Sequence, residues 1–393
     1  MAKPQIIGLG GGGADEEATR RLLAHAVGLS GAEAPKVAVV PTAVGDDAAT
    51  VLRMYDLLPT RAITYVPFFP WPPADLRELA LQQDAIFVCG GNTANMLAIW
   101  RVHGFDRILR DAWEAGVVLA GWSAGMICWF EAGVTDSFGP QLEGMRDGLG
   151  FLAGSGIRNG LPKLARMAER HIVALGGAPS SEEETRRLLA YPVGLARTSA
   201  PKVCVVPTAA ADSAATVLTV YDSLPDRAVP SYLPFFPWPP DDLRRFTLDH
   251  DVILVGGGNT ANMLAIWRIH GFDAILREAW EAGIVLTGWS AGMICWFEAG
   301  VTDSFGPQLE GMRDGLGFLD GSACPHYDGE ELRRPVYTRL VANGFPPGIA
   351  ADDGVGVHYV GTELAEVVTV RDGACAYRVE PDGESALDAR RLG

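Results

Sequence analysis

The sequence predicts an α/β protein in which a three-layer, doubly wound and mostly parallel sheet occurs in two tandem copies. Short β-branched segments, such as 37–40 (VAVV) and 85–91 (AIFVCGG), alternate with helical segments such as 94–116. Strands that alternate with helices form a parallel sheet covered on both faces, and its ligands bind beyond the carboxyl ends of the strands. The chain has 393 residues, of which 48% are apolar, so it is long enough for two such cores.

The duplication is visible as long repeated segments. GGNTANMLAIWR occurs at 90–101 and again at 257–268, and residues 121–152 return unchanged at 288–319. The period is about the size of a domain and is far longer than that of a solenoid repeat. The chain is therefore expected to contain two copies of one domain.

The two copies diverge after Leu152 and Leu319. The second copy continues through ACPHYDGE and GIAADD to the end of the chain, whereas the first runs into the next first strand. The first copy therefore lacks its C-terminal third. We predict a truncated first copy at 1–155, a linker at 156–168 and a complete catalytic domain at 169–393.

Composition excludes several classes of function. The formal net charge is −16 and no concentrated basic face offsets it, so a nucleic-acid backbone would be repelled. The six cysteines form no CxxC pair, which predicts neither a zinc site nor a disulfide framework and favours the reducing cytoplasm. The N-terminal segment lacks the pattern of a secretory signal, and no apolar segment is long enough to cross a membrane. We expect a cytoplasmic protein with no metal, cofactor, nucleic-acid or membrane partner.

Ser290 is the candidate nucleophile. It lies in LTGWSAGM, where an apolar strand meets a sharp turn and then a helix. This is the context in which the GxSxG pattern exposes a serine at a helix N-terminus, which favours a developing negative charge. The pattern alone is weak in a chain with 47 glycines, and the flanking strand and helix strengthen it.

A second glycine turn, VGGGNTANML, is expected beside this serine in a doubly wound sheet. The amides of Gly257 or Gly258, together with that of Ala291, would then form an oxyanion hole. The structural alternative is a tight turn capped by Asn259 or Thr260, and both interpretations can hold together.

His326 is the candidate base among seven histidines. It follows a proline in the polar loop ACPHYDGE, and functional groups are common in such loops. His358 in VGVHYV is the alternative, although its position is typical of a half-buried strand residue.

A carboxylate should orient the imidazole. Asp353 and Asp352 follow the histidine in PPGIAADD, and Asp303 in VTDSFGP follows the nucleophile helix. Each can equally be a turn or cap residue, so the choice stays open at this stage.

The second copy resembles the serine peptidase family that contains aspartyl dipeptidase (peptidase E) and, more distantly, cyanophycinase. The matching motifs are GGGNT at 256–260, GWSAGM at 288–293, CPHYDGE at 324–330 and GIAADD at 348–353. They occur in the family's order and cover nearly all of the second copy. The resemblance implies a fold similar to class I glutamine amidotransferases, no metal, and a cytoplasmic location.

The resemblance also implies a role for individual residues. Ser290, His326 and Asp353 would form the triad, with the amides of Gly258 and Ala291 in the oxyanion hole. Asn259 and Arg333 would hold the N-terminal aspartate of a substrate. The loop after the histidine is shorter than in the dipeptidases, so Arg334 is the alternative to Arg333.

The first copy keeps Ser123 and Asn92 but has GSGIRNG in place of the histidine motif. Without a base, Ser123 should be slower by orders of magnitude, because triad members act as a unit. The family commonly forms dimers, so we expect a homodimer or an intrachain pairing of the two copies.

The sequence thus predicts a serine hydrolase that cleaves small peptides with an N-terminal aspartate through an acyl-enzyme. One alternative is a cyanophycinase-like hydrolase of aspartyl-arginine polymer. The other is a non-catalytic scaffold left by a damaged duplication, against which the intact motifs of the second copy argue.

Overall fold

The computed structural model describes residues 5–11, 16–139, 141–152, 169–196 and 198–393. The chain divides into two compact units. Unit 1 comprises residues 1–161 with 235–241, and unit 2 comprises residues 162–234 with 242–393. The predicted linker at 156–168 and the predicted end of the first copy lie outside the described residues.

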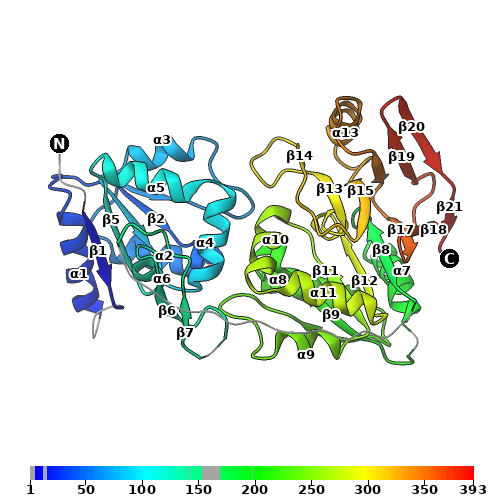
Figure 1. Ribbon diagram of the computed structural model, residues 1–393, viewed down its shortest axis with the longest axis horizontal. Helices are drawn as coiled ribbons and strands as arrows, with labels where there is room; N and C mark the ends of the chain where they lie inside the picture. The colour runs from blue at the N-terminus through cyan, green and yellow to red at the C-terminus, as the bar shows by residue number, and fades with distance from the viewer. Residues whose placement is uncertain (1–4, 12–15, 140, 153–168, 197) are drawn as a thin grey trace. The chain divides into compact units, whose positions relative to one another are not determined.

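Unit 1 contains a parallel sheet of five strands in the order β1-β5-β4-β2-β3 (Figure 1). Its strands are β1 (Ile6–Leu9), β2 (Val37–Val40), β3 (Ile63–Tyr65), β4 (Ala85–Val88) and β5 (Val118–Trp122), with an antiparallel pair formed by β6 (Gly133–Thr135) and β7 (Glu143–Met145). Its helices are α1 (Glu16–Gly28), α2 (Ala48–Leu57), α3 (Leu76–Leu81), α4 (Thr93–Val102), α5 (Phe105–Glu114) and α6 (Ala124–Ile127), with a 3-10 turn at Thr42–Val44.

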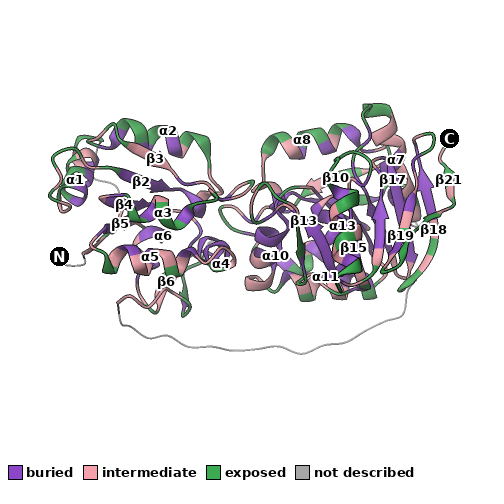
Figure 2. Cartoon of the chain, turned by 90° about the horizontal axis from the view of Figure 1, so that it is seen from above, coloured by how far each residue is buried: buried purple, intermediate pink, exposed green. Residues whose placement is uncertain are grey.

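Helices cover both faces of this sheet. α1 and α2 lie on one face, and α4 and α5 lie on the other (Figure 2). Every residue of β2 and β4 is buried, which is why these strands are continuously apolar rather than alternating.

Unit 2 repeats these five strands and extends them. Its main sheet has the order β10-β9-β11-β12-β8-β17-β18-β21, in which the first five strands are parallel and β17 is antiparallel to β8. The strands are β8 (His171–Leu175), β9 (Lys202–Val206), β10 (Val229–Tyr232), β11 (Val252–Val255), β12 (Val285–Trp289), β17 (Val355–Val360), β18 (Glu363–Thr369) and β21 (Ala389–Arg391). The helices are α7 (Glu182–Leu195), α8 (Ala214–Ser223), α9 (Leu243–Leu248), α10 (Thr260–Ile269), α11 (Phe272–Glu281), α12 (Ala291–Ile294) and α13 (Arg333–Ala342), with a 3-10 turn at Thr208–Ala210.

A second, mixed sheet of six strands is found in unit 2. Its order is β14-β13-β15-β16-β19-β20. The strands are β13 (Phe297–Thr302), β14 (Glu310–Met312), β15 (Leu319–Cys324), β16 (Gly348–Ala351), β19 (Ala376–Glu380) and β20 (Gly383–Leu387). It packs with α13 around a core that includes Val301, Tyr337 and Val379.

The predicted fold class is confirmed in both copies: each contains a parallel sheet between helices. The six-stranded sheet of unit 2 was not predicted. Its strands β13 and β14 belong to the segment shared with the first copy, whereas β16, β19, β20 and all of β15 after Leu319 are built from residues that the first copy lacks. Among the described residues, no helix combines the length and apolar character needed to span a bilayer.

Candidate active site

Ser290 lies at a sharp turn between β12 and α12. Its backbone angles, φ 56° and ψ −114°, are outside the regions that a serine ordinarily adopts. A Cβ on Gly288 or Gly292 would lie 2.5 Å or 2.3 Å from the carbonyl oxygen of Val255. Both positions therefore require glycine, and the turn has the strained strand-to-helix form that the GxSxG pattern predicts.

Free amide groups lie beside this turn. In the described part of the chain, the N–H groups of Gly257, Gly258 and Ala291 form no hydrogen bond. A Cβ placed on Gly257 would be 3.2 Å from the Cβ of Ser290, so this backbone passes close to the serine. These amides could stabilise an oxyanion on a carbonyl that Ser290 attacks.

His326 reaches the same edge of the sheet through the backbone. β8 and β12 are parallel neighbours with Leu175 opposite Trp289, so Gly176 and Ser290 are the next residues at their carboxyl ends. The N–H of His326 donates to the carbonyl oxygen of Gly176 at 3.1 Å. Within the described ranges, no hydrogen bond joins the Ser290 hydroxyl to the imidazole.

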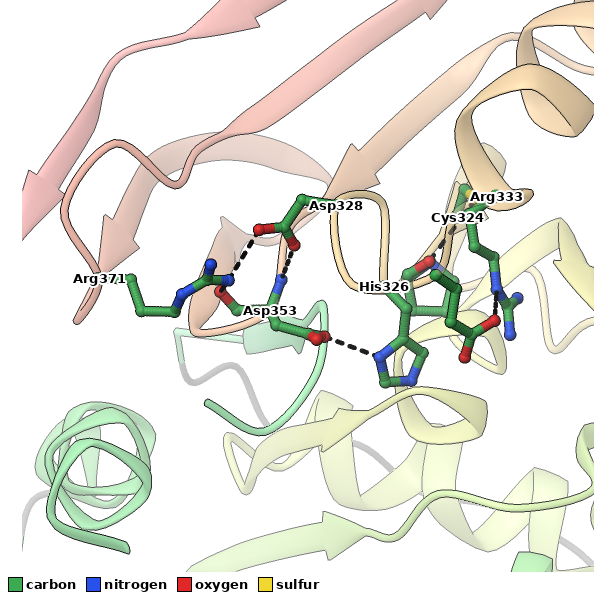
Figure 3. A network of polar contacts seen from close by, with 8 residues as sticks. Cys324, His326, Asp328, Arg333, Asp353 and Arg371 are labelled. Atoms are coloured by element: carbon green, nitrogen blue, oxygen red, sulfur yellow. Dashed lines mark hydrogen bonds and ion pairs between the residues drawn. The ribbon is translucent and has the colours of Figure 1, made fainter. Parts of the chain in front are cut away.

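Asp353 is the carboxylate that contacts the imidazole (Figure 3). Its Oδ1 lies 2.7 Å from Nδ1 of His326, and both side chains are largely buried. A Cβ on Gly177 would lie 1.9 Å from Oδ1 of Asp353, and one on Gly329 would lie 2.1 Å from its Oδ2. The pair therefore fits between two stretches of backbone that have no side chain.

The two other candidate carboxylates lie elsewhere. Asp352 is 3% exposed and its Oδ2 accepts the N–H of Cys375 at 3.0 Å; burial raises the pKa of this carboxyl to about 6. Asp303 follows β13, and no contact joins it to His326 in the part of the chain that is described. Of the three, only Asp353 is positioned to orient the imidazole.

Asn259 caps α10. Its Oδ1 accepts the N–H of Asn262 at 2.8 Å, its Nδ2 donates to the carbonyl oxygen of Ser304 at 2.8 Å, and the residue is 2% exposed. The capped-turn interpretation therefore holds for this residue. The side-chain amide that a substrate would contact here is already hydrogen-bonded to Asn262 and Ser304.

Neither candidate arginine has a free guanidinium. Arg333 is 3% exposed, donates from Nη1 to the carbonyl oxygen of Val301 at 2.8 Å, and pairs through Nε with Glu330 at 2.7 Å. Arg334 forms an ion pair with Glu384 and lies over the rings of Tyr327 and Tyr377. In this conformation, neither arginine offers an unpaired charge to an acidic ligand.

Two residues that the sequence analysis did not single out lie behind the His326–Asp353 pair (Figure 3). Asp328 accepts the backbone N–H of Asp353 at 2.9 Å, and Arg371 donates to the carbonyl oxygen of Asp353 at 2.8 Å. Asp328 could have been noticed because it is two residues after His326. No sequence signal distinguishes Arg371, which follows a different strand.

In unit 1 the elbow is present, and the described residues place no histidine–aspartate pair beside it. Ser123 has φ 52° and ψ −114°, nearly the angles of Ser290. Asn92 caps α4 and donates to the carbonyl oxygens of Ser137 and Pro237, both at 2.8 Å. The GSGIRNG segment that replaces the histidine motif lies outside the described residues.

Three comparisons relate the chain to known proteins. The model of peptidase family S51 matches residues 6–157 and again 172–367. Uncharacterized peptidase YgaJ of Bacillus subtilis (strain 168) is 47% identical over 213 residues, which cover 53% of this chain and 92% of that protein. Peptidase E of Shewanella denitrificans is 29% identical over 133 residues, 32% of this chain and 57% of that protein. A solved peptidase from an acI-B1 Actinobacterium has 17% identity and a TM-score of 0.40, covering 56% of this chain and 95% of that one.

Proposed function

The chain belongs to peptidase family S51 and is a serine-type peptidase; from this premise, we propose that hydrolysis takes place in unit 2 alone, at Ser290, His326 and Asp353. The observation that carries the proposal is the 2.7 Å contact between His326 and Asp353 at the sheet edge where the Ser290 elbow lies. Unit 1 has the elbow but, among its described residues, no histidine at that edge.

The chemistry follows from these positions. The Ser290 hydroxyl attacks the scissile carbonyl while Nε2 of His326 takes its proton and then gives it to the leaving amine. Asp353 holds Nδ1 of the imidazole, so that Nε2 faces the serine. The amides of Gly258 and Ala291 stabilise the oxyanion, and water activated by His326 hydrolyses the acyl-enzyme.

For the substrate, we propose a small peptide with an N-terminal aspartate. The name of the Shewanella relative and the motif resemblance support this choice. Arg333 is the first residue of α13, which follows the His326 loop, and its guanidinium is paired with Glu330, whose side chain is 47% exposed. An aspartyl substrate must therefore compete with Glu330 for Arg333, which predicts a modest preference over neutral peptides.

Two measurements test the proposal in stages. A fluorophosphonate probe, mapped by mass spectrometry, should label Ser290 and leave Ser123 unlabelled; absence of label at Ser290 would reject the active site. The kcat/KM for Asp-Leu should exceed that for Ala-Leu and Arg-Leu. Equal values would reject the aspartyl preference and leave the peptidase assignment intact, and release of fragments from cyanophycin would favour the polymer-cleaving alternative.

A further inference from the structure

The Asp353 backbone is held on both sides by a closed ring of three contacts (Figure 3). Asp328 Oδ1 accepts the N–H of Asp353 at 2.9 Å, and Nη1 of Arg371 donates to the carbonyl oxygen of Asp353 at 2.8 Å. The same Nη1 donates to Oδ2 of Asp328 at 2.8 Å, which closes the ring. Both peptide groups that flank the Asp353 side chain are thereby fixed.

The ring joins three loops that are distant in sequence. Asp328 lies on the loop that carries His326, Asp353 lies between β16 and β17, and Arg371 lies between β18 and β19. A displacement of one loop would therefore change the position of the carboxylate relative to the imidazole. The ring supplements the single hydrogen bond that joins His326 to Asp353 directly.

The backbone after Asp353 leaves room for the Arg371 side chain to pass beside it. Gly354 has φ +78°, and a Cβ there would lie 2.8 Å from Cδ of Arg371. The side chains of Arg371 and Asp328 are about two-thirds buried, at 34% and 32% exposed, so water screens their ion pair less than it would at the surface.

Arg371 is also one of two arginines whose charge acts on a group of acidic side chains; the other is Arg334. Asp328, Asp352 and Asp353 gather within this region, and Arg371 pairs with the first and hydrogen-bonds the backbone of the third. Without its charge, the mutual repulsion of the carboxylates would favour separation of the loops.

We propose that Arg371 and Asp328 are positioning residues for the reaction, which hold Asp353 where it can orient His326. The proposal rests on the proposed function. The two side chains contact each other and the Asp353 backbone, so their loss should lower kcat and leave KM nearly unchanged.

The experiment compares Arg371→Gln with Arg371→Lys. Because a single nitrogen of Arg371 makes both contacts, a lysine ammonium can replace them, whereas glutamine loses the charge. Arg371→Gln should lower kcat for Asp-Leu and the rate of fluorophosphonate labelling at Ser290 by about 10- to 100-fold, with KM within about twofold. Arg371→Lys should recover both rates to within about threefold of wild type.

Arg268 provides a matched control. It is also 34% exposed and also binds one carboxylate and one backbone carbonyl oxygen, which both belong to Asp314 here, at 2.6 Å and 2.7 Å. Arg268→Gln should leave both rates at the wild-type value. An equal loss in Arg268→Gln and Arg371→Gln would reduce the effect to general destabilisation and overturn the proposal.

A readout independent of catalysis separates this proposal from the proposed function. Proton NMR should show a low-field signal from the His326–Asp353 hydrogen bond, assigned by its loss in His326→Ala, and Arg371→Gln should broaden or remove it. A wild-type protein that is neither labelled nor active would reject the proposed function, and the NMR signal would still decide the role of Arg371. Retention of the signal and of the rates in Arg371→Gln would overturn the proposal.

A second variant covers the case in which Arg371→Gln does not fold. Asp328→Asn keeps an oxygen that accepts the N–H of Asp353, but its amide nitrogen cannot accept from Nη1 of Arg371, so the contact between the two side chains is lost. It should lower the labelling rate by about 3- to 10-fold, less than Arg371→Gln, because one of the three contacts is lost. Wild-type rates in Asp328→Asn would overturn the proposal in that case.

Discussion

Residues 121–152 and 288–319 have the same sequence and different surroundings. The backbone of the elbow is nearly identical in the two copies, at φ 52° for Ser123 and 56° for Ser290. Burial differs sharply: Val134 is 60% exposed and its counterpart Val301 is 0% exposed. All four residues of α12 are buried, whereas only two of the four in α6 are.

The cause is the missing C-terminal third. In unit 2, β13 pairs with β15 as well as β14, whereas its counterpart β6 pairs only with β7 in the described part of unit 1. Local sequence is therefore sufficient to form the nucleophile turn. In unit 2, the residues that follow Leu319 bury the segment after the turn, and they also include His326 and Asp353.

The largest expected difference between the copies is catalytic. Ser290→Ala should lower kcat by roughly 10⁴-fold or more, while Ser123→Ala should leave it unchanged, since among the described residues only Ser290 lies at a sheet edge with a histidine, the proposed base His326. Hydrolysis of Asp-Leu by the two purified variants measures this. Loss of activity in Ser123→Ala would break the comparison, because it would mean that unit 1 carries the chemistry.

The second prediction concerns the choice of carboxylate. Asp353→Asn should lower kcat by roughly 10³- to 10⁴-fold, because the amide cannot hold the imidazole in the required tautomer. Asp352→Asn should remain within about threefold of wild type, because asparagine keeps the acceptor for the N–H of Cys375. Equal losses in kcat for the two variants would contradict the assignment from geometry.

The third prediction uses the pH dependence of stability. Burial raises the pKa of Asp352 from 3.8 to about 6, so the folded state binds a proton more tightly than the unfolded chain. The contribution of Asp352 to the free energy of unfolding of unit 2 should therefore be greatest below about pH 4. It should fall by on the order of 2–3 kcal/mol as the pH rises through 6. Urea denaturation measures this change in stability, with hydrogen exchange used to follow each unit separately.

Asp352→Asn is the control for this pH effect, since it should flatten the pH dependence of unit 2. Unit 1 offers a parallel case, because burial raises the pKa of Asp46 to about 7. The stability of unit 1 should fall with rising pH over a range that extends about one pH unit higher than in unit 2. Parallel curves for wild type and Asp352→Asn would show that Asp352 does not titrate as described.

The smallest expected effect compares packing at equivalent positions. Val301→Ala should destabilise unit 2 by about 1–2 kcal/mol, because the side chain is fully buried. Val134→Ala should cost less than about 0.5 kcal/mol, because the side chain is mostly exposed. Similar costs for the two variants would show that unit 1 buries Val134 in solution.

Much of this architecture could be predicted from the sequence because it depends on local patterns. The strand and helix alternation, the repeat and the turn at Ser290 are all encoded within short segments. The six-stranded sheet was missed because short strands such as Glu310–Met312 and Gly383–Leu387 have little apolar periodicity to distinguish them.

The site was predictable only in part, for a different reason. His326 and Asp353 lie in motifs, but the choice between Asp352 and Asp353 depends on which side chain the strand end directs toward the imidazole. The motif resemblance could single out Arg333. It could not predict that this residue is buried against Val301 and Glu330, because that burial depends on tertiary packing. No sequence pattern marks Arg371, because its role depends on contacts with two loops that are distant in sequence.

The glycine turn after the first strand has a consequence for engineering. Gly10 and Gly11 of unit 1 are the counterparts of Gly176 and Gly177. Among the described residues, a Cβ on Gly10 or Gly11 would meet nothing within 4 Å, whereas one on Gly177 would lie 1.9 Å from Oδ1 of Asp353 and 2.5 Å from Nδ1 of His326. Grafting the segment that follows Leu319 after Leu152 would keep a native junction and bring the histidine and aspartate motifs to Ser123, which on the proposed function would give the chain a second hydrolytic centre.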